Sequence, residues 1–147
     1  MTLEPLTSVD DQNDARPATE DAGGQPERPA GRRPPPAAPV IALRMEGLLT
    51  WTAERVAKFP RDHKFTVGDR LLETCLDIMA ALTEAAYRRD KQAVLAAASR
   101  GLVRARILSR LARVLLCLSE AQHLHFVRES DEVGRMLGGW IRSGASR

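Results

Sequence analysis

Apolar residues recur at spacings of three and four through most of the chain after its first 40 residues, which is the period of an amphipathic α-helix. Short polar breaks, several containing Pro or Gly, divide this pattern into separate stretches. They predict helices over residues 41–58, 66–88, 91–118 and 120–137. Because short connections between amphipathic helices favour antiparallel neighbours, the sequence predicts an all-α fold, an antiparallel up-down four-helix bundle.

Each predicted helix has an apolar stripe that we expect to face the core. The stripes comprise Ile41, Met45, Leu48, Leu49, Thr52 and Val56 in the first helix; Val67, Leu71, Cys75, Ile78, Met79, Leu82 and Ala86 in the second; Val103, Ile107, Leu108, Leu111, Val114, Leu115 and Leu118 in the third; and Phe126, Val133 and Leu137, continued by Trp140, in the fourth. Trp51 lies off the first stripe, so it either packs against a neighbouring helix or marks an interface.

The junction between the first two helices contains several structural signals. Pro60 ends the first helix, because proline lacks an N–H and has a fixed φ. Thr66 followed by Asp69 resembles a capping box and predicts the start of the next helix. Phe59 and Phe65 flank the turn, and we expect them to fasten it to the core.

The ends of the fourth helix are predicted from two further signals. Ser119 precedes Glu120 and is expected to cap the helix. Gly138 and Gly139 are expected to stop it, because glycine readily takes the left-handed conformation that follows a helix. Nearby, His123 and His125 are two residues apart and point to different helix faces, which makes them poor joint metal ligands.

The polar positions of the third predicted helix are mostly arginine, and no acidic residue occurs between Asp90 and Glu120. With about 100° of rotation per residue, three of the arginines fall within about 60° of one another and two others form a pair one turn apart. The first group is Arg106, Arg110 and Arg113, and the pair is Arg100 and Arg104. A solvated helix usually mixes both signs of charge, so this bias is the least ordinary feature of the composition.

Guanidinium groups suit both phosphates and carboxylates, which leaves two interpretations. The arginines either bind the phosphates of nucleic acid or an acidic partner, or they pair with acidic residues of this chain, within the subunit or across an interface. The candidates for such pairing are Asp69, Glu73 and Asp77, which follow one another at helical spacing. Lys58, Arg61 and Lys64 at the first junction extend the candidate binding surface.

Composition divides the chain into unlike parts. Residues 1–39 are rich in Pro and Gly, lack aromatic residues and carry a net charge of −3, so we expect a disordered tail. Residues 40–142 form the predicted bundle, and residues 143–147 a flexible C-terminal tail. From residue 40 onward, 18 Lys and Arg against 12 Asp and Glu give +6. This charge fits an acidic partner, with nucleic acid as the first candidate, or a helical domain that merely has a basic surface.

The sequence shows no catalytic or metal-binding pattern. It contains no Gly-rich phosphate loop, nucleophile elbow or H-E-x-x-H motif, which argues against an enzyme and predicts no cofactor or metal. Cys75 and Cys117 lie in apolar patterns and are expected to be reduced core thiols. With no signal peptide and no membrane-length apolar run, we expect a cytoplasmic protein.

Several motifs resemble a known family. The junction Phe59-Pro60 with Lys64 to Leu71 is similar to the first junction of the four-helix bundles related to ribosomal intervening-sequence proteins. Two further motifs resemble the Avd branch of these bundles, the accessory variability determinants of diversity-generating retroelements. The first is Arg110-Leu111-Ala112 with Leu115 and Ser119, and the more specific one is Gly134-Arg135-Met136-Leu137-Gly138-Gly139-Trp140. The resemblance covers about residues 43–142 and excludes the Pro-rich tail.

The resemblance implies a homopentameric barrel of four-helix bundles with a basic surface. It also implies binding to the element's reverse transcriptase and template RNA, and possibly cDNA, in support of mutagenic reverse transcription. The alternative is a protein-only oligomeric scaffold of the wider ribosomal intervening-sequence family. The sequence does not determine which target gene is diversified or what the Pro-rich tail does. Nor does it determine which group the arginines of the third helix contact.

Overall fold

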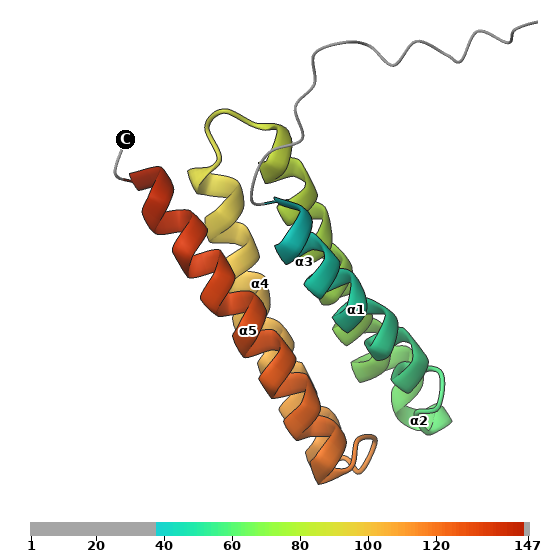
Figure 1. Ribbon diagram of the computed structural model, residues 1–147. Helices are drawn as coiled ribbons and strands as arrows, with labels where there is room; N and C mark the ends of the chain where they lie inside the picture. The colour runs from blue at the N-terminus through green and yellow to red at the C-terminus, as the bar shows by residue number, and fades with distance from the viewer. Residues whose placement is uncertain (1–37, 146–147) are drawn as a thin grey trace, which may run out of the picture. The chain divides into compact units, whose positions relative to one another are not determined.

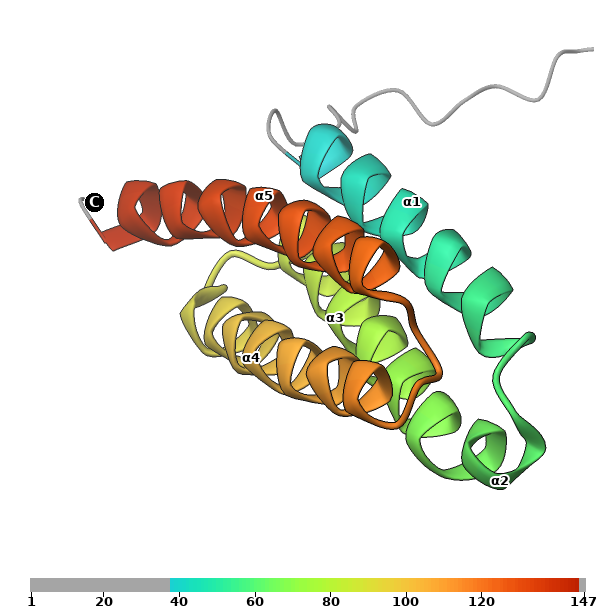
Figure 2. The ribbon, with the colours of Figure 1, turned by 90° about the horizontal axis from the view of Figure 1, so that it is seen from below.

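The computed structural model describes residues 38–145, and these form an antiparallel four-helix bundle (Figure 1). In chain order the elements are α1 (Ala38–Val56), α2 (Arg61–His63), the π-helix η1 (Lys64–Gly68), α3 (Asp69–Tyr87), α4 (Gln92–Val114) and α5 (Glu120–Ala145). The long helices pack against their chain neighbours, and α1 also packs against α5, as Figure 2 shows from below. The predicted all-α bundle is confirmed. The predicted N-terminal tail lies almost wholly outside the described residues.

The first junction differs from its prediction. The second predicted helix begins with a short helix and a π-helix, and Thr66 Oγ1 donates a hydrogen bond to the carbonyl of His63 at 3.3 Å instead of capping α3. Phe59 is buried, as expected, but Phe65 is 64% exposed. Of the two phenylalanines that flank the turn, only Phe59 therefore packs in the core.

The prediction that Gly138 and Gly139 stop the last helix is wrong, because α5 continues to Ala145. Leu137 is buried, and Trp140 and Ile141 beyond the glycines are half-buried against the same core. This packing extends the helix in spite of the low helix propensity of glycine. At the other end of α5 the predicted cap is confirmed: the Gln122 N–H donates to Ser119 Oγ at 3.1 Å, and the Ser119 N–H donates to Gln122 Oε1 at 2.9 Å.

The predicted core stripes of α1, α3 and α5 are buried or half-buried, but the stripe predicted for the third helix is only partly correct: Leu118 is buried and Leu108 and Leu115 pack against the core, whereas its other four residues are exposed. The buried side chains of α4 are Leu95, Ala98, Leu102, Ala105, Ser109 and Ala112. Five of the seven predicted residues lie on α4, and none of these five is fully buried. Small inner side chains let α4 approach its neighbours closely, which leaves its larger aliphatic residues outside.

Polar contacts join α4 to α5 inside the bundle. Ser109 Oγ lies 2.8 Å from His123 Nδ1, in hydrogen-bonding distance. Burial, followed by the positive charges of Arg113 and Arg110, lowers the pKa of His123. His125 instead contacts Trp51 in a tilted arrangement with ring centroids 4.8 Å apart, so Trp51 packs against a neighbouring helix, one of its two expected roles.

The two cysteines are free thiols in different surroundings. Cys75 is buried in α3, and its thiol lies 4.0 Å from Thr52 Oγ1. Burial raises the pKa of Cys75 to about 11, so this thiol is protonated and unreactive at neutral pH. Cys117 is half-buried and lies in the connection after α4, not inside a helix.

We expect alanine at two glycines to have opposite effects on stability. A Cβ at Gly101 would lie 2.7 Å from Cγ1 of buried Ile78, and such overpacking costs about 1–3 kcal/mol. At Gly47 nothing lies within 4 Å, so Gly47→Ala gains helix propensity worth about 1 kcal/mol. Thermal unfolding should show a lower midpoint for Gly101→Ala and a higher one for Gly47→Ala. A midpoint raised by both changes would contradict the close packing of α3 on α4.

We also expect a pH dependence from His123. Its pKa is lowered in the folded state, so the unfolded chain binds the proton more readily. The stability that this residue contributes is therefore full above its ordinary pKa of 6.5 and is lost as the pH falls through the lowered folded value. Urea unfolding at pH 7.5 and 5.5 should show a smaller loss in His123→Gln than in the wild type. His125→Gln is the matched control, and equal losses in all three proteins would refute the assignment.

Candidate nucleic-acid and partner interface on α4

The outer face of α4 has an aliphatic ridge that we name the α4 seam: Val103, Ile107, Leu111 and Val114. These side chains are 53, 62, 42 and 64% exposed, respectively. Their spacing of four, four and three keeps them in one row along the helix. An exposed row of large aliphatic residues is unusual on a surface that meets only water, so it indicates a contact surface.

Arginines flank the seam on both sides. Arg100 and Arg104 lie on the edge toward α3, where they line a groove together with α3 residues. Arg106 and Arg113 lie on the edge toward α5, since each forms an ion pair with an acidic residue of that helix. Arg110 is exposed and lies close enough to His123 to lower its pKa. The seam therefore separates the two arginine groups that helical spacing predicted.

The groove between α3 and α4 has a volume of about 500 Å³. Its walls include Arg70, Glu73 and Asp77 from α3 and Arg100 and Arg104 from α4. None of the ion pairs within 4.0 Å found among the described residues joins these arginines to these carboxylates. The predicted pairing of the arginines with the acidic row of α3 is thus not formed inside the described subunit.

Two of the predicted arginines are held by contacts within the bundle. Arg106 Nη2 donates to the Ser130 carbonyl at 3.2 Å and lies 3.1 Å from Asp131 Oδ1, while its Nε donates to Ser130 Oγ at 3.3 Å. Gly134 makes room for this guanidinium, because a Cβ there would lie 2.9 Å from Nη2. Arg113 makes a longer pair with Glu120 at 3.9 Å. By contrast, no ion pair in the described part of the chain involves Arg100, Arg104 or Arg110, which we name the unpaired arginines.

The basic residues of the first junction lie at one end of the bundle. Lys58 and Arg61 are exposed, and the Lys64 ammonium lies 5.7 Å from the centre of the Phe65 ring. The π-helix η1 packs against α4 as well as α3, and this end also holds the α4–α5 connection (Figure 1). The junction residues and the α4 arginines are therefore neighbouring surfaces, not one continuous row.

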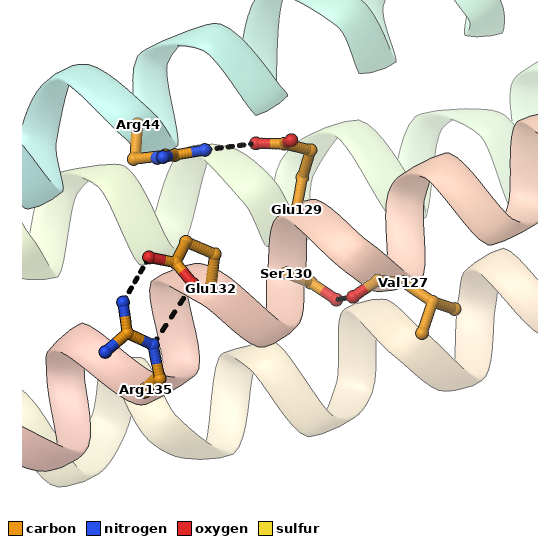
Figure 3. A network of polar contacts seen from close by, with 6 residues as sticks. All are labelled: Arg44, Val127, Glu129, Ser130, Glu132 and Arg135. Carbon is orange, nitrogen blue, oxygen red and sulfur yellow. Dashed lines mark hydrogen bonds and ion pairs between the residues drawn. The ribbon is translucent and has the colours of Figure 1, made fainter.

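The face formed by α1 and α5 is different, because two of its arginines, Arg44 and Arg135, are paired with carboxylates of α5. Figure 3 shows Arg44 of α1 pointing at Glu129 of α5, with 3.3 Å between Nη1 and Oε2. Arg135 makes two hydrogen bonds to Glu132, and these bonds hold the pKa of that carboxyl below its ordinary value. On α4, by contrast, three arginines form no ion pair with a described residue.

Sequence reasoning located the arginines but missed two surface features, the exposed α4 seam and the exposed Phe65 ring. The sequence did contain one signal for the seam. A second row of mostly small residues, from Leu95 to Ala112, also has helical spacing and could equally have been assigned to the core. Within residues 38–145 no group of three or more His, Cys, Asp or Glu residues has a metal-binding arrangement. None of the described helices is long and apolar enough to span a membrane.

The comparisons with known proteins agree with the fold and the motifs. The family described as bAvd-like matches residues 39–144, which is more than two-thirds of the chain. No curated protein and no solved structure gives a significant match. The chain belongs to the bAvd-like family, the bacterial Avd accessory determinants of diversity-generating retroelements.

Proposed function

We propose that this chain is a non-enzymatic cytoplasmic subunit that binds the reverse transcriptase of a diversity-generating retroelement, together with its template RNA or cDNA. In this role it supports mutagenic reverse transcription. Family membership implies the accessory role itself. The α4 surface supports the more specific proposal about nucleic-acid and polymerase contacts.

The observation that supports nucleic-acid binding most strongly is the set of unpaired arginines. Arg100, Arg104 and Arg110 project from a helix without an acidic residue, and no described carboxylate forms an ion pair with them. Arg106 and Arg113 add positive charge beside them, and Lys58, Arg61 and Lys64 extend the surface at one end. Phosphates, or acidic residues of the polymerase, would supply the missing counter-charges.

The α4 seam supports a second part of the proposal, assembly into a homo-oligomer. The family resemblance implies that this oligomer is a pentamer. Exposed aliphatic side chains gain little from phosphates but gain by burial against protein, at about 25 cal/mol per Å². The exposed acidic row of α3, Asp69, Glu73 and Asp77, is complementary to the arginines that flank the seam. A neighbouring copy could therefore bury the seam and pair part of this charge.

We expect glutamine at Arg100, Arg104 and Arg110 together to weaken RNA binding and to make it less dependent on salt. Loss of three phosphate contacts should reduce the slope of log K against log salt by about two to three. Fluorescence anisotropy with template RNA between 50 and 300 mM salt measures both quantities. Arg128→Gln is the control for the loss of one charge, because Arg128 is also exposed but lies on α5.

An unchanged affinity and salt slope in the triple variant would overturn the α4 assignment. If the wild type showed no specific RNA binding and the arginine changes dissociated the oligomer, the protein-only scaffold would replace the proposal.

We expect aspartate at Ile107 and Leu111 to disrupt the oligomer, since it would place charge in the middle of the buried seam. Light scattering should show the particle mass falling to that of a single chain, with helix content retained. Leu43→Asp is the matched control, because Leu43 is 67% exposed on α1, away from the seam. A mass unaffected by the seam changes would show that the seam has another partner.

A further inference from the structure

Phe65 is exposed in a protein whose aromatic residues are otherwise mostly packed. The chain has six Phe, Tyr and Trp residues, all in the described part, and only Phe65 and Tyr87 are exposed, at 64 and 76%. A lone exposed aromatic residue needs no explanation by itself. The surroundings of Phe65 distinguish it from an ordinary surface residue.

The backbone around Phe65 is held firmly to the core. Val67 and Gly68, which follow it in η1, are buried. Gly68 lies so close to α1 that a Cβ there would be 2.9 Å from Val56 Cγ1 and 3.2 Å from Phe59 Cδ2. A π-helical turn is rare and is often found at functional sites. The Phe65 ring is therefore exposed to solvent on a turn whose following residues are packed in the core.

One basic side chain lies beside this ring, and two more are close to it in the sequence. The Lys64 ammonium lies 5.7 Å from the ring centre, and Lys58 and Arg61 are exposed nearby in the sequence. Among the ion pairs of the described residues, none involves these three side chains. Asp62 is the one acidic residue between Lys58 and Lys64, so the turn has a net positive charge.

We infer that Phe65 is a stacking platform for an unpaired base of single-stranded nucleic acid, with Lys58, Arg61 and Lys64 binding the adjacent phosphates. Aromatic rings beside basic side chains bind single strands in this way, because every base has a face that stacks. In a duplex the bases are already stacked, so the platform selects single-stranded segments. The inference rests on the proposed nucleic-acid binding and assigns it a second contact, separate from the α4 arginines.

Tyr87 provides a natural comparison. It ends α3, about 30 Å from Phe65 at 1.5 Å per residue. Arg88 beside it is paired with Glu84 at 2.7 Å, and Lys91 lies over the Trp140 ring at 5.4 Å. Two of the cations near Tyr87, Arg88 and Lys91, are thus engaged with other groups, and Arg89 is exposed. Near Phe65, Lys64 contacts the Phe65 ring itself, and Lys58 and Arg61 form no ion pair with a described residue.

The test measures binding of short single-stranded RNA and DNA oligonucleotides that contain 2-aminopurine, whose fluorescence is quenched by stacking. We expect the full-length wild type to quench the probe and Phe65→Leu to abolish this quenching. Phe65→Leu should also weaken binding by about 5- to 100-fold, the range expected for one stacked base. Phe65→Tyr should restore both properties, and Tyr87→Leu should change neither.

An oligonucleotide without bases separates stacking from charge. Wild type and Phe65→Leu should bind it equally, and their salt slopes on the normal oligonucleotide should match. The inference would be overturned if wild type and Phe65→Leu bound the normal oligonucleotide with equal affinity. It would also be overturned if Phe65→Leu lost the same affinity for the normal oligonucleotide and for the one without bases. If Phe65→Leu kept its nucleic-acid binding but no longer co-purified with the reverse transcriptase, Phe65 would be assigned to a protein contact instead. If the wild type bound no oligonucleotide at all, both the proposed function and the inference would fail. If the glutamine changes at Arg100, Arg104 and Arg110 weakened binding but Phe65→Leu did not, only the inference would fail.

Discussion

The close packing of α4 against its neighbours determines the surface of this protein. The inner face of α4 is largely alanine and serine, and Gly101 lies directly against Ile78 of α3. Because these inner side chains are small, α4 can pack close to α3 and α5. Its larger aliphatic residues and most of its arginines must then face outward. The same packing that completes the bundle therefore creates the seam and its basic flanks.

Electrostatics divides the faces of the bundle into two kinds. On the face formed by α1 and α5, Arg44 meets Glu129 and Arg135 meets Glu132. On α4, Arg100, Arg104 and Arg110 form no ion pair with a described residue, although Glu73 and Asp77 line the same groove as Arg100 and Arg104. Solvent-exposed pairs add little stability, so this asymmetry matters more for association than for folding. An accessory role, which membership of the family implies, agrees with the proposal that this surface binds partners.

The sequence predicted the bundle because apolar periodicity and capping signals report local structure directly. It failed where a tertiary contact decided between two local options. In α4 two rows had helical spacing, and close packing selected the row of small residues over Val103 and Ile107. At the first junction, Gly68 packs against Val56, and the chain forms a π-helical turn where a cap at Thr66 was expected. In α5, core contacts of Trp140 carried the helix past two glycines.

The candidate surface was only partly predictable for the same reason. Arginine spacing in α4 gave the two groups correctly, since helical geometry fixes their angles. The contacts of Arg106 with Ser130 and Asp131 depend on how α4 meets α5, which no local pattern reports. The exposure of Phe65 likewise depends on the packing of the turn against α1.

The most direct test of the central claim is chemical footprinting of arginines with phenylglyoxal, read by mass spectrometry, with and without template RNA. The account predicts that RNA protects Arg100, Arg104 and Arg110 from modification while Arg128 stays reactive. Protection confined to Arg128 or to the α1 and α5 face, with the α4 arginines still reactive, would contradict it.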